Sequence, residues 1–232
     1  MPFDELNALA ITATTFARLN EIAGSKKPKS LPIDRYFDEM DLPAADAKLR
    51  KEYAKRMEDI LLICLALLFE LLKRDAHGNA SEVKRKLRDD LTKLAEEITS
   101  PDSYMQSYIA QYADRFIDST VRKAQRYFKD EEDKLAYWFS EDRATYNAEN
   151  EANTVLNYDE FRIAKEMGMT RKRWVTMKDE RVRATHASVH GVEVPIDGFF
   201  QVGESIMRFP KDTEYCTDPE EIVACRCSVT YF

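Results

Sequence analysis

The chain has 232 residues, of which 44% are hydrophobic and 33% are charged, a composition that indicates a globular protein and excludes a disordered or fibrous one. Its formal net charge of -7 argues against nucleic-acid binding through bulk electrostatics, although a local basic stripe is compatible with this total. The longest apolar run, residues 60–69, is about half as long as a membrane-spanning helix, so no membrane partner is expected.

Apolar residues at spacings of three and four predict a series of helices. Ser81, Ser100 followed by Pro101, and Ser140 are typical residues of helix starts. Gly168 is expected to end the last helix in a left-handed conformation. The expected helices cover residues 9–23, 45–73, 81–98, 101–121 and 141–168, with a lysine-containing linker over residues 25–32.

The spacing of glycines changes near Gly168. Two glycines precede this position, and the other four lie at or after it. Because glycine is unfavourable inside helices and useful in turns, we expect a helical region over residues 1–167 and a turn-rich module over residues 168–232. The short loops between the helices indicate antiparallel packing in a helical bundle.

Short segments with β character follow Gly168. They predict a small, mostly antiparallel sheet, with a short helix or helical turn over residues 179–190. The expected fold class is therefore α+β, with a long helical N-terminal region followed by a small C-terminal α+β module. The expected strands cover residues 174–177, 192–194, 205–209 and 227–231.

The residues best suited to chemistry are concentrated in the last quarter of the chain. Asp179 and Arg183 are four positions apart, which on a helical turn predicts an ion pair, and His186 follows on the same face. The simpler interpretation is a polar cluster that holds this turn against the sheet. The alternative is a catalytic set of Asp, Arg and His.

Cys225 and Cys227 would lie on one face of a strand, because strand side chains alternate. Together with His186 and either Cys216 or His190, they could form a four-coordinate zinc site that stabilises a module with a small core. The set His186, Cys216, Cys225 and Cys227 is the predicted metal site. A disulfide formed after release from the cell and simple buried thiols remain open as alternatives.

Two clusters of basic residues could contact DNA phosphates. One contains Lys26, Lys27 and Lys29 in the linker, and the other is formed by residues 171–173. Ordinary solvated charge is the simpler interpretation of both clusters.

An ordered set of motifs carries a resemblance to a known family. The motifs are Trp174-Val175-Thr176, Asp179-Glu180-Arg181-Val182-Arg183-x-x-His186, Gly191, Pro210 and Cys225-Arg226-Cys227. In this order, over about residues 140–232, the chain resembles the Mu F-like family of phage minor head proteins, also called the phage head morphogenesis family. The upstream residues 143–151 resemble a helix of this family, from which Asn147 and Asn150 depart.

The resemblance implies a structural protein of the phage head without enzymatic activity. Such a protein would be made in the host cytoplasm, enter the head during procapsid assembly, and reside in the virion, in the capsid interior or at the portal vertex. The expected partners are the portal protein, other head or scaffold proteins and packaged DNA, with an influence on DNA packaging or ejection. The alternative is a phage-delivered, nuclease-like effector that uses His186 as acid or base and Arg183 to stabilise a phosphate.

Overall fold

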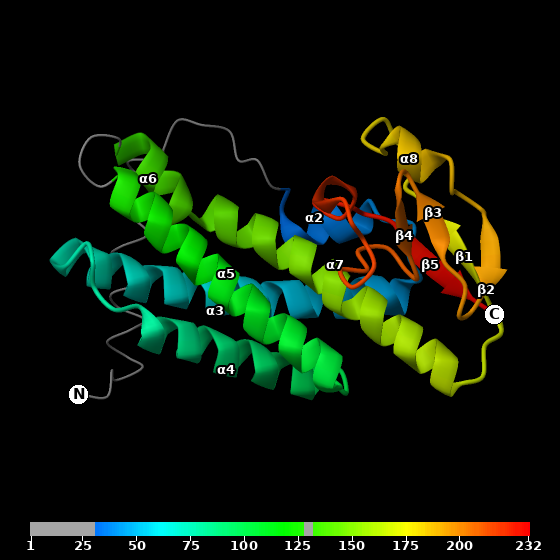
Figure 1. The fold of residues 1–232 in the computed structure, drawn as a ribbon, viewed down its shortest axis with the longest axis horizontal. Coiled ribbons are helices and arrows are strands. Elements are labelled where there is room, and N and C mark those ends of the chain that lie inside the picture. Colours follow the sequence, from blue (N-terminus) through cyan, green and yellow to red (C-terminus); the bar gives the residue numbers. More distant parts are fainter. Residues whose placement is uncertain (1–30, 128–131) are drawn as a thin grey trace. The chain divides into compact units, whose positions relative to one another are not determined.

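The computed structural model describes residues 31–127 and 132–232 (Figure 1). The expected helix over residues 9–23 and the three linker lysines lie outside the described residues. The contacts divide the chain into two compact units. The described part of the first unit begins at Tyr53 and ends at Ala148, and the second unit contains Pro32–Glu52 and Glu149–Phe232.

Helices make up most of the described residues before Gly168. The four long helices agree with the predicted ones, whereas α2 and α6 are too short to show a helical period in the sequence. Their bounds are α2, Ile33–Asp38; α3, Ala44–Arg74; α4, Ser81–Ile98; α5, Ser103–Tyr127; α6, Glu132–Trp138; and α7, Glu141–Glu166. Helices α3 and α7 contribute residues to both units, so the units divide the chain inside these helices rather than where helix gives way to strand.

Side chains of short polar residues accept hydrogen bonds from backbone N–H groups at the starts of α5 and α7. The predicted Ser140 cap is confirmed, because its hydroxyl accepts a hydrogen bond from the backbone N–H of Arg143 at 3.2 Å. The predicted cap at Ser100 is wrong. Helix α5 begins three residues later, and the carboxylate of Asp102 accepts the bond from the N–H of Met105 at 2.9 Å.

Two further predicted helix ends have different outcomes. Ser81 is the first residue of α4 rather than its cap, and its backbone N–H donates to the side chain of Asn79 at 2.9 Å. Gly168 has a φ of 74° directly after α7, which confirms the left-handed ending.

The first unit is built from helices whose apolar faces are buried. Helices α4 and α5 lie side by side (Figure 1). Their buried residues recur at spacings of three and four, as the predicted amphipathic helices require. Those residues include Leu87, Leu91 and Leu94 of α4 and Ile109, Ala113, Phe116 and Ile117 of α5. None of the helices in the described parts of the chain is both long and apolar enough to cross a membrane.

The second unit contains the strands. Strand β1 (Arg171–Val175) lies between β2 (Glu193–Pro195) and β5 (Ser228–Tyr231), and both of its neighbours are antiparallel to it (Figure 1). Strands β3 (Phe200–Val202) and β4 (Ser205–Met207) form a separate antiparallel pair. The expected α+β class is confirmed, with two small sheets in place of one and with β3 missing from the predicted strands.

Arg50, on the first turns of α3, is a buried cation at the centre of a polar network in the second unit. Its side chain is fully buried, and its guanidinium donates to Asn153 Oδ1 at 2.8 Å and to Asn157 Oδ1 at 3.0 Å. It also forms an ion pair with Glu160 at 2.6 Å. The three partners lie on one face of α7, because their spacings of three and four return to the same side of a helix. This network joins the start of α3 to α7.

Lys172 is a buried lysine on β1. Its ammonium donates to the carbonyl of Ile196 at 2.7 Å and lies 4.7 Å from the ring centre of Phe161. Burial, followed by the nearby charge of Arg208, lowers the pKa of Lys172 from 10.5 to about 8. Between these two pH values the unfolded chain binds more protons than the folded one, so this group makes the protein more stable as pH rises.

We therefore expect Lys172→Met to remove a pH-dependent part of the stability. A fall in pKa from 10.5 to about 8 corresponds to roughly 3 kcal/mol, gained as pH rises through that range. Urea unfolding of both proteins at several pH values between 7.5 and 10.5 measures the difference. Lys165→Met serves as the control, because Lys165 is half exposed. An unchanged slope in the Lys172→Met protein would contradict the prediction.

Candidate metal centre

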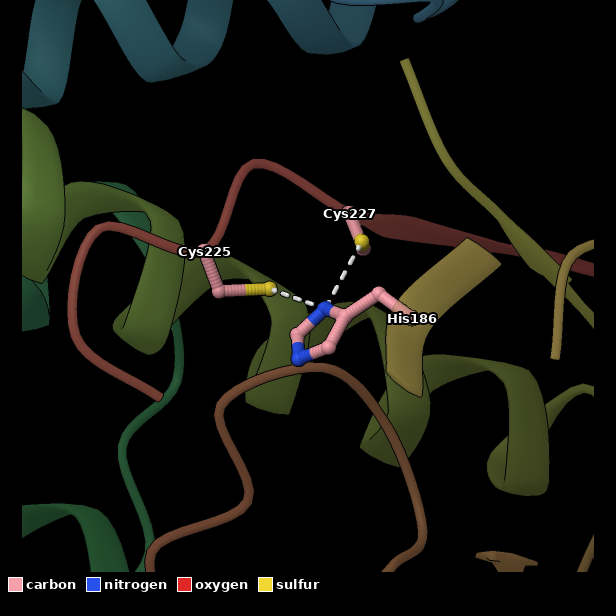
Figure 2. A group of neighbouring side chains, drawn as sticks. All are labelled: His186, Cys225 and Cys227. Carbon is pink, nitrogen blue, oxygen red and sulfur yellow. Dashed lines mark hydrogen bonds between the residues drawn. The ribbon is translucent and has the colours of Figure 1, made fainter. Parts of the chain in front are cut away.

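Three side chains converge in the core of the second unit. His186 lies on α8 (Ala184–Ala187), and Cys225 and Cys227 lie in the segment that leads into β5. The Sγ atoms of Cys227 and Cys225 are 3.3 Å and 3.5 Å from Nδ1 of His186. Figure 2 shows both sulfur atoms facing this one ring nitrogen. One ligand atom from each of the three residues lies within 4.8 Å of the other two, and all three residues are buried.

Apolar packing around Trp174 positions the histidine. Trp174 is fully buried on β1, and its ring meets the ring of His186 edge to face at a centroid distance of 5.8 Å. On its other side the indole packs against Phe200 at 5.1 Å. The indole N–H is buried and lies near the thiol of Cys227, where it partly opposes the rise in that thiol's pKa that Cys225 and burial cause. Trp174, the first residue of the motif set, thus packs directly against the cluster of His186, Cys225 and Cys227.

Asparagines of α7 hold the loop that carries the cysteines. The amide of Asn153 donates to the carbonyl of Cys225 at 3.0 Å, and Asn150 Oδ1 accepts from the backbone N–H of Ala224 at 3.1 Å. Asn150 also accepts from the ammonium of Lys211, which is buried. Ala224 has a φ of 54°, an uncommon conformation for a residue with a Cβ, so these bonds hold a strained turn directly before Cys225.

Glu221 binds the other nitrogen of the histidine. It ends a short 3-10 helix, η1 (Pro219–Glu221), and its Oε2 lies 2.9 Å from Nε2 of His186. The same oxygen accepts a hydrogen bond from the hydroxyl of Thr185 at 2.9 Å. A carboxylate accepts hydrogen bonds, so this contact places a proton on Nε2. In the neutral ring, the lone pair of Nδ1 then faces the sulfur atoms. Sequence reasoning missed this role, because Glu221 is one of two adjacent glutamates in an acidic turn and no motif distinguishes it.

Gly203 makes room for that carboxylate. The glycine has a φ of 58°, and a Cβ built on it would lie 2.7 Å from Oε1 of Glu221. Both the backbone conformation and the close approach favour glycine at this position.

The charges of the cluster are coupled. The hydrogen bond with Cys227, together with His186 and Lys211, outweighs burial and holds the pKa of Cys225 well below its usual value. The same hydrogen bond and burial raise the pKa of Cys227. Burial alone would lower the pKa of His186, but the hydrogen bond and charge of Cys225 and the charge of Glu221 raise it. The shifts of Cys225, Cys227 and His186 therefore have their origin in the same set of contacts.

The predicted ion pair between Asp179 and Arg183 is wrong. Both carboxylate oxygens of Asp179 accept from Nη2 of Arg226, at 2.6 Å and 2.8 Å, and Arg183 donates to the carbonyl of Val223 at 2.5 Å. The physical reason is that residues 179–183 do not form a helix. Helix α8 begins only at residue 184, so positions four apart do not face each other.

Neither proposed fourth ligand joins the cluster. The thiol of Cys216 donates to the carbonyl of Asp218 at 3.0 Å and lies outside the group. Nδ1 of His190 accepts from the backbone N–H of Thr176 at 3.1 Å. Of the predicted set of four, the structure brings together His186, Cys225 and Cys227, and Cys216 is not part of this group. Cys216 lies nine positions before Cys225, and its contacts with the turn before η1 direct it elsewhere.

The positive charges at residues 171–173 are mostly buried or paired, so few of them could contact DNA phosphates. Lys172 is buried, and the side chains of Arg171 and Arg173 both form ion pairs with Glu193 across the β1–β2 pair. This arrangement favours the simpler interpretation of the cluster, in which the charges serve the fold.

Comparison with known proteins gives one family match. No curated protein and no solved structure matches the chain. The family described as Phage Mu protein F like protein matches residues 78–230, a span that contains the motifs from Trp174 to Cys227 and extends upstream into α4 and α5. Since the match covers well over half of its residues, the chain belongs to the Phage Mu protein F like family.

Proposed function

We propose that the chain is a minor head protein that binds the portal protein and enters the phage head during procapsid assembly. The observation that carries this proposal is the family match over residues 78–230, because the family is one of phage head morphogenesis proteins. The match includes parts of both compact units, so both are expected to serve this role. Residence at the portal vertex or in the capsid interior, with contacts to other head or scaffold proteins, follows from the same proposal.

Contact with packaged DNA is a further part of this proposal. The net charge of -7 and the pairing of Arg171 and Arg173 with Glu193 restrict any such contact to a local one. Binding through phosphate contacts weakens steeply with salt. A DNA-binding titration at several salt concentrations therefore measures how many phosphates the chain contacts.

The nuclease-like alternative gains no support from the arrangement of its residues. His186 is 2% exposed, and both of its ring nitrogens have partners within the core. The guanidinium of Arg183 is bound to a backbone carbonyl. General acid-base catalysis requires a group within hydrogen-bond reach of the substrate, and this histidine is covered. The structural role is the better supported one.

Co-expression with the portal protein of the same phage tests the proposal. We expect the two chains to co-migrate in size-exclusion chromatography with a fixed stoichiometry by mass measurement. The portal protein of an unrelated phage is the control and should separate from this chain. Separation from the cognate portal protein, combined with absence of the chain from purified virions by mass spectrometry, would refute the assignment.

A further inference from the structure

We propose that Nδ1 of His186 and the Sγ atoms of Cys225 and Cys227 bind one zinc ion, with water as the fourth ligand. Two thiolates and an imidazole are a ligand set that zinc prefers, and sites with three protein ligands keep a position for water. Among residues 31–127 and 132–232, no other histidine, cysteine or carboxylate belongs to the group. This inference is independent of the proposed role in the head.

The spacing of the donor atoms fits a tetrahedral ion. Bond lengths of about 2.0–2.1 Å to nitrogen and about 2.3 Å to sulfur, at tetrahedral angles, place the nitrogen about 3.5–3.6 Å from each sulfur. The observed distances from Nδ1 of His186 are 3.3 Å to Cys227 and 3.5 Å to Cys225. Both nitrogen–sulfur distances are therefore within a few tenths of an ångström of those around a tetrahedral zinc ion.

Hydrogen bonds can join these three atoms only in pairs. With its proton on Nε2, His186 offers a single lone pair at Nδ1, and this pair can accept only one S–H. Two sulfur atoms nevertheless lie within reach of it. A disulfide between Cys225 and Cys227 would use both sulfurs and leave the lone pair buried without a partner. A metal ion satisfies all three atoms at once.

The surroundings of the histidine are those of a metal ligand. A histidine that binds a metal through one nitrogen commonly donates its other N–H to a carboxylate, which fixes the ring and raises its basicity. Glu221 occupies this position at 2.9 Å and is itself held by the hydroxyl of Thr185. The ion would connect α8 to the segment before β5, two parts of the chain that are some 40 positions apart in sequence.

Metal analysis of the intact chain, purified under reducing conditions, tests the proposal. We expect one zinc per chain by mass spectrometry of the metal. Replacement of zinc by Co²⁺ should give strong visible bands typical of a tetrahedral site and thiolate-to-metal charge transfer from two sulfurs. The Cys225→Ser and Cys227→Ser proteins should each lose half of that charge transfer and bind zinc at least 100-fold more weakly. The control Cys216→Ser should behave as the unchanged protein does.

Glu221 is expected to act as a positioning residue. Changing such a carboxylate typically weakens metal binding by about 10–100-fold, so Glu221→Gln should weaken zinc binding by this factor while keeping the two-thiolate charge transfer. Glu220→Gln is the matched control, because Glu220 is the exposed neighbour and does not contact the histidine. Gly203→Ala should act in the same direction as Glu221→Gln, because the added Cβ meets the Glu221 carboxylate.

Counting the reactive thiols separates the zinc site from simple buried thiols and from a disulfide. This test holds even if a cysteine variant fails to fold. One outcome is that the protein without substitutions binds neither Zn²⁺ nor Co²⁺ and that all four of its thiols react in denaturant. This result would show simple buried thiols and overturn the proposal. Loss of two reactive thiols in the absence of reductant, again with no bound metal, would show a disulfide and also overturn it. Both measurements use the isolated chain, so their result is separate from that of the portal experiment.

Discussion

Replacing Arg50 with methionine should destabilise the second unit by about 3–5 kcal/mol, because removal of one member of a buried ion pair leaves its partner uncompensated. Arg50 is fully buried and donates to Asn153, Asn157 and Glu160. Methionine has a similar length but no donors. The Glu160 side chain remains 27% exposed, which favours the lower end of the range.

The position of the two tryptophans allows this effect to be assigned to one unit. The chain has two tryptophans, Trp138 in the first unit and Trp174 in the second. In a Trp138→Phe background, fluorescence during urea unfolding reports Trp174 and thus the second unit. Arg35→Met is the matched control in the same unit, because Arg35 is 67% exposed in its pair with Glu39. It should have a much smaller effect, as exposed ion pairs contribute little.

Acidification provides a second check on the same variant. Burial raises the pKa of Glu160, and the charge of Arg50 opposes that rise. In the Arg50→Met protein, the carboxyl of Glu160 takes up a proton more readily. The protonated carboxyl is neutral, so it is no longer a buried charge without a partner. The destabilisation caused by Arg50→Met should therefore shrink as pH falls. Equal effects of Arg50→Met and Arg35→Met at neutral pH would contradict the assigned role of the network.

The long helices could be predicted because their periodicity repeats over many turns. Helix α3 carries enough apolar residues at spacings of three and four that its predicted bounds, residues 45–73, differ from Ala44–Arg74 by one position at each end. The short elements could not be predicted in this way. Strand β3, Phe200–Val202, is three residues long, and so short a segment shows neither helical nor strand periodicity. Its existence depends on pairing with β4.

The candidate site was predictable only where residue type alone limited the choice. Cys225, Cys227 and His186 are rare side chains that bind metals, and the structure brings them together. The prediction of an Asp179–Arg183 ion pair is wrong because it required a helix that the chain does not form there. The support from Glu221 and Asn153 could not be predicted, because both are common polar residues whose roles arise from contacts distant in sequence.

The network around Arg50 and the candidate metal centre share a residue. Asn153 accepts from Arg50 through its oxygen and donates to the Cys225 carbonyl through its nitrogen. An amide that is fully buried with both ends bonded has one orientation, so the arginine fixes the direction in which the amide donates. The hydrogen bonds that stabilise α3 against α7 thereby also position the cysteine loop.

Replacing Trp174 with alanine should destabilise the second unit by about 3–5 kcal/mol, the range for removal of a large buried aromatic side chain. Trp174 is fully buried and contacts both Phe200 and His186. Alanine would leave a cavity beside the histidine and beside the cysteines that pack in the same core. Loss of the indole ring should also weaken zinc binding, since the imidazole ring of His186 would no longer be held in one orientation.

Trp174→Phe separates the packing from the indole N–H. Phenylalanine keeps most of the apolar contacts, so this variant should be less destabilised than Trp174→Ala and should still bind one zinc per chain. Denaturant unfolding followed by circular dichroism measures both variants without relying on tryptophan fluorescence, and Trp138→Ala, at a half-buried position of the first unit, is the control. Equal destabilisation by Phe and Ala at position 174 would contradict the packing argument, because it would show that the N–H rather than the ring volume carries the stability.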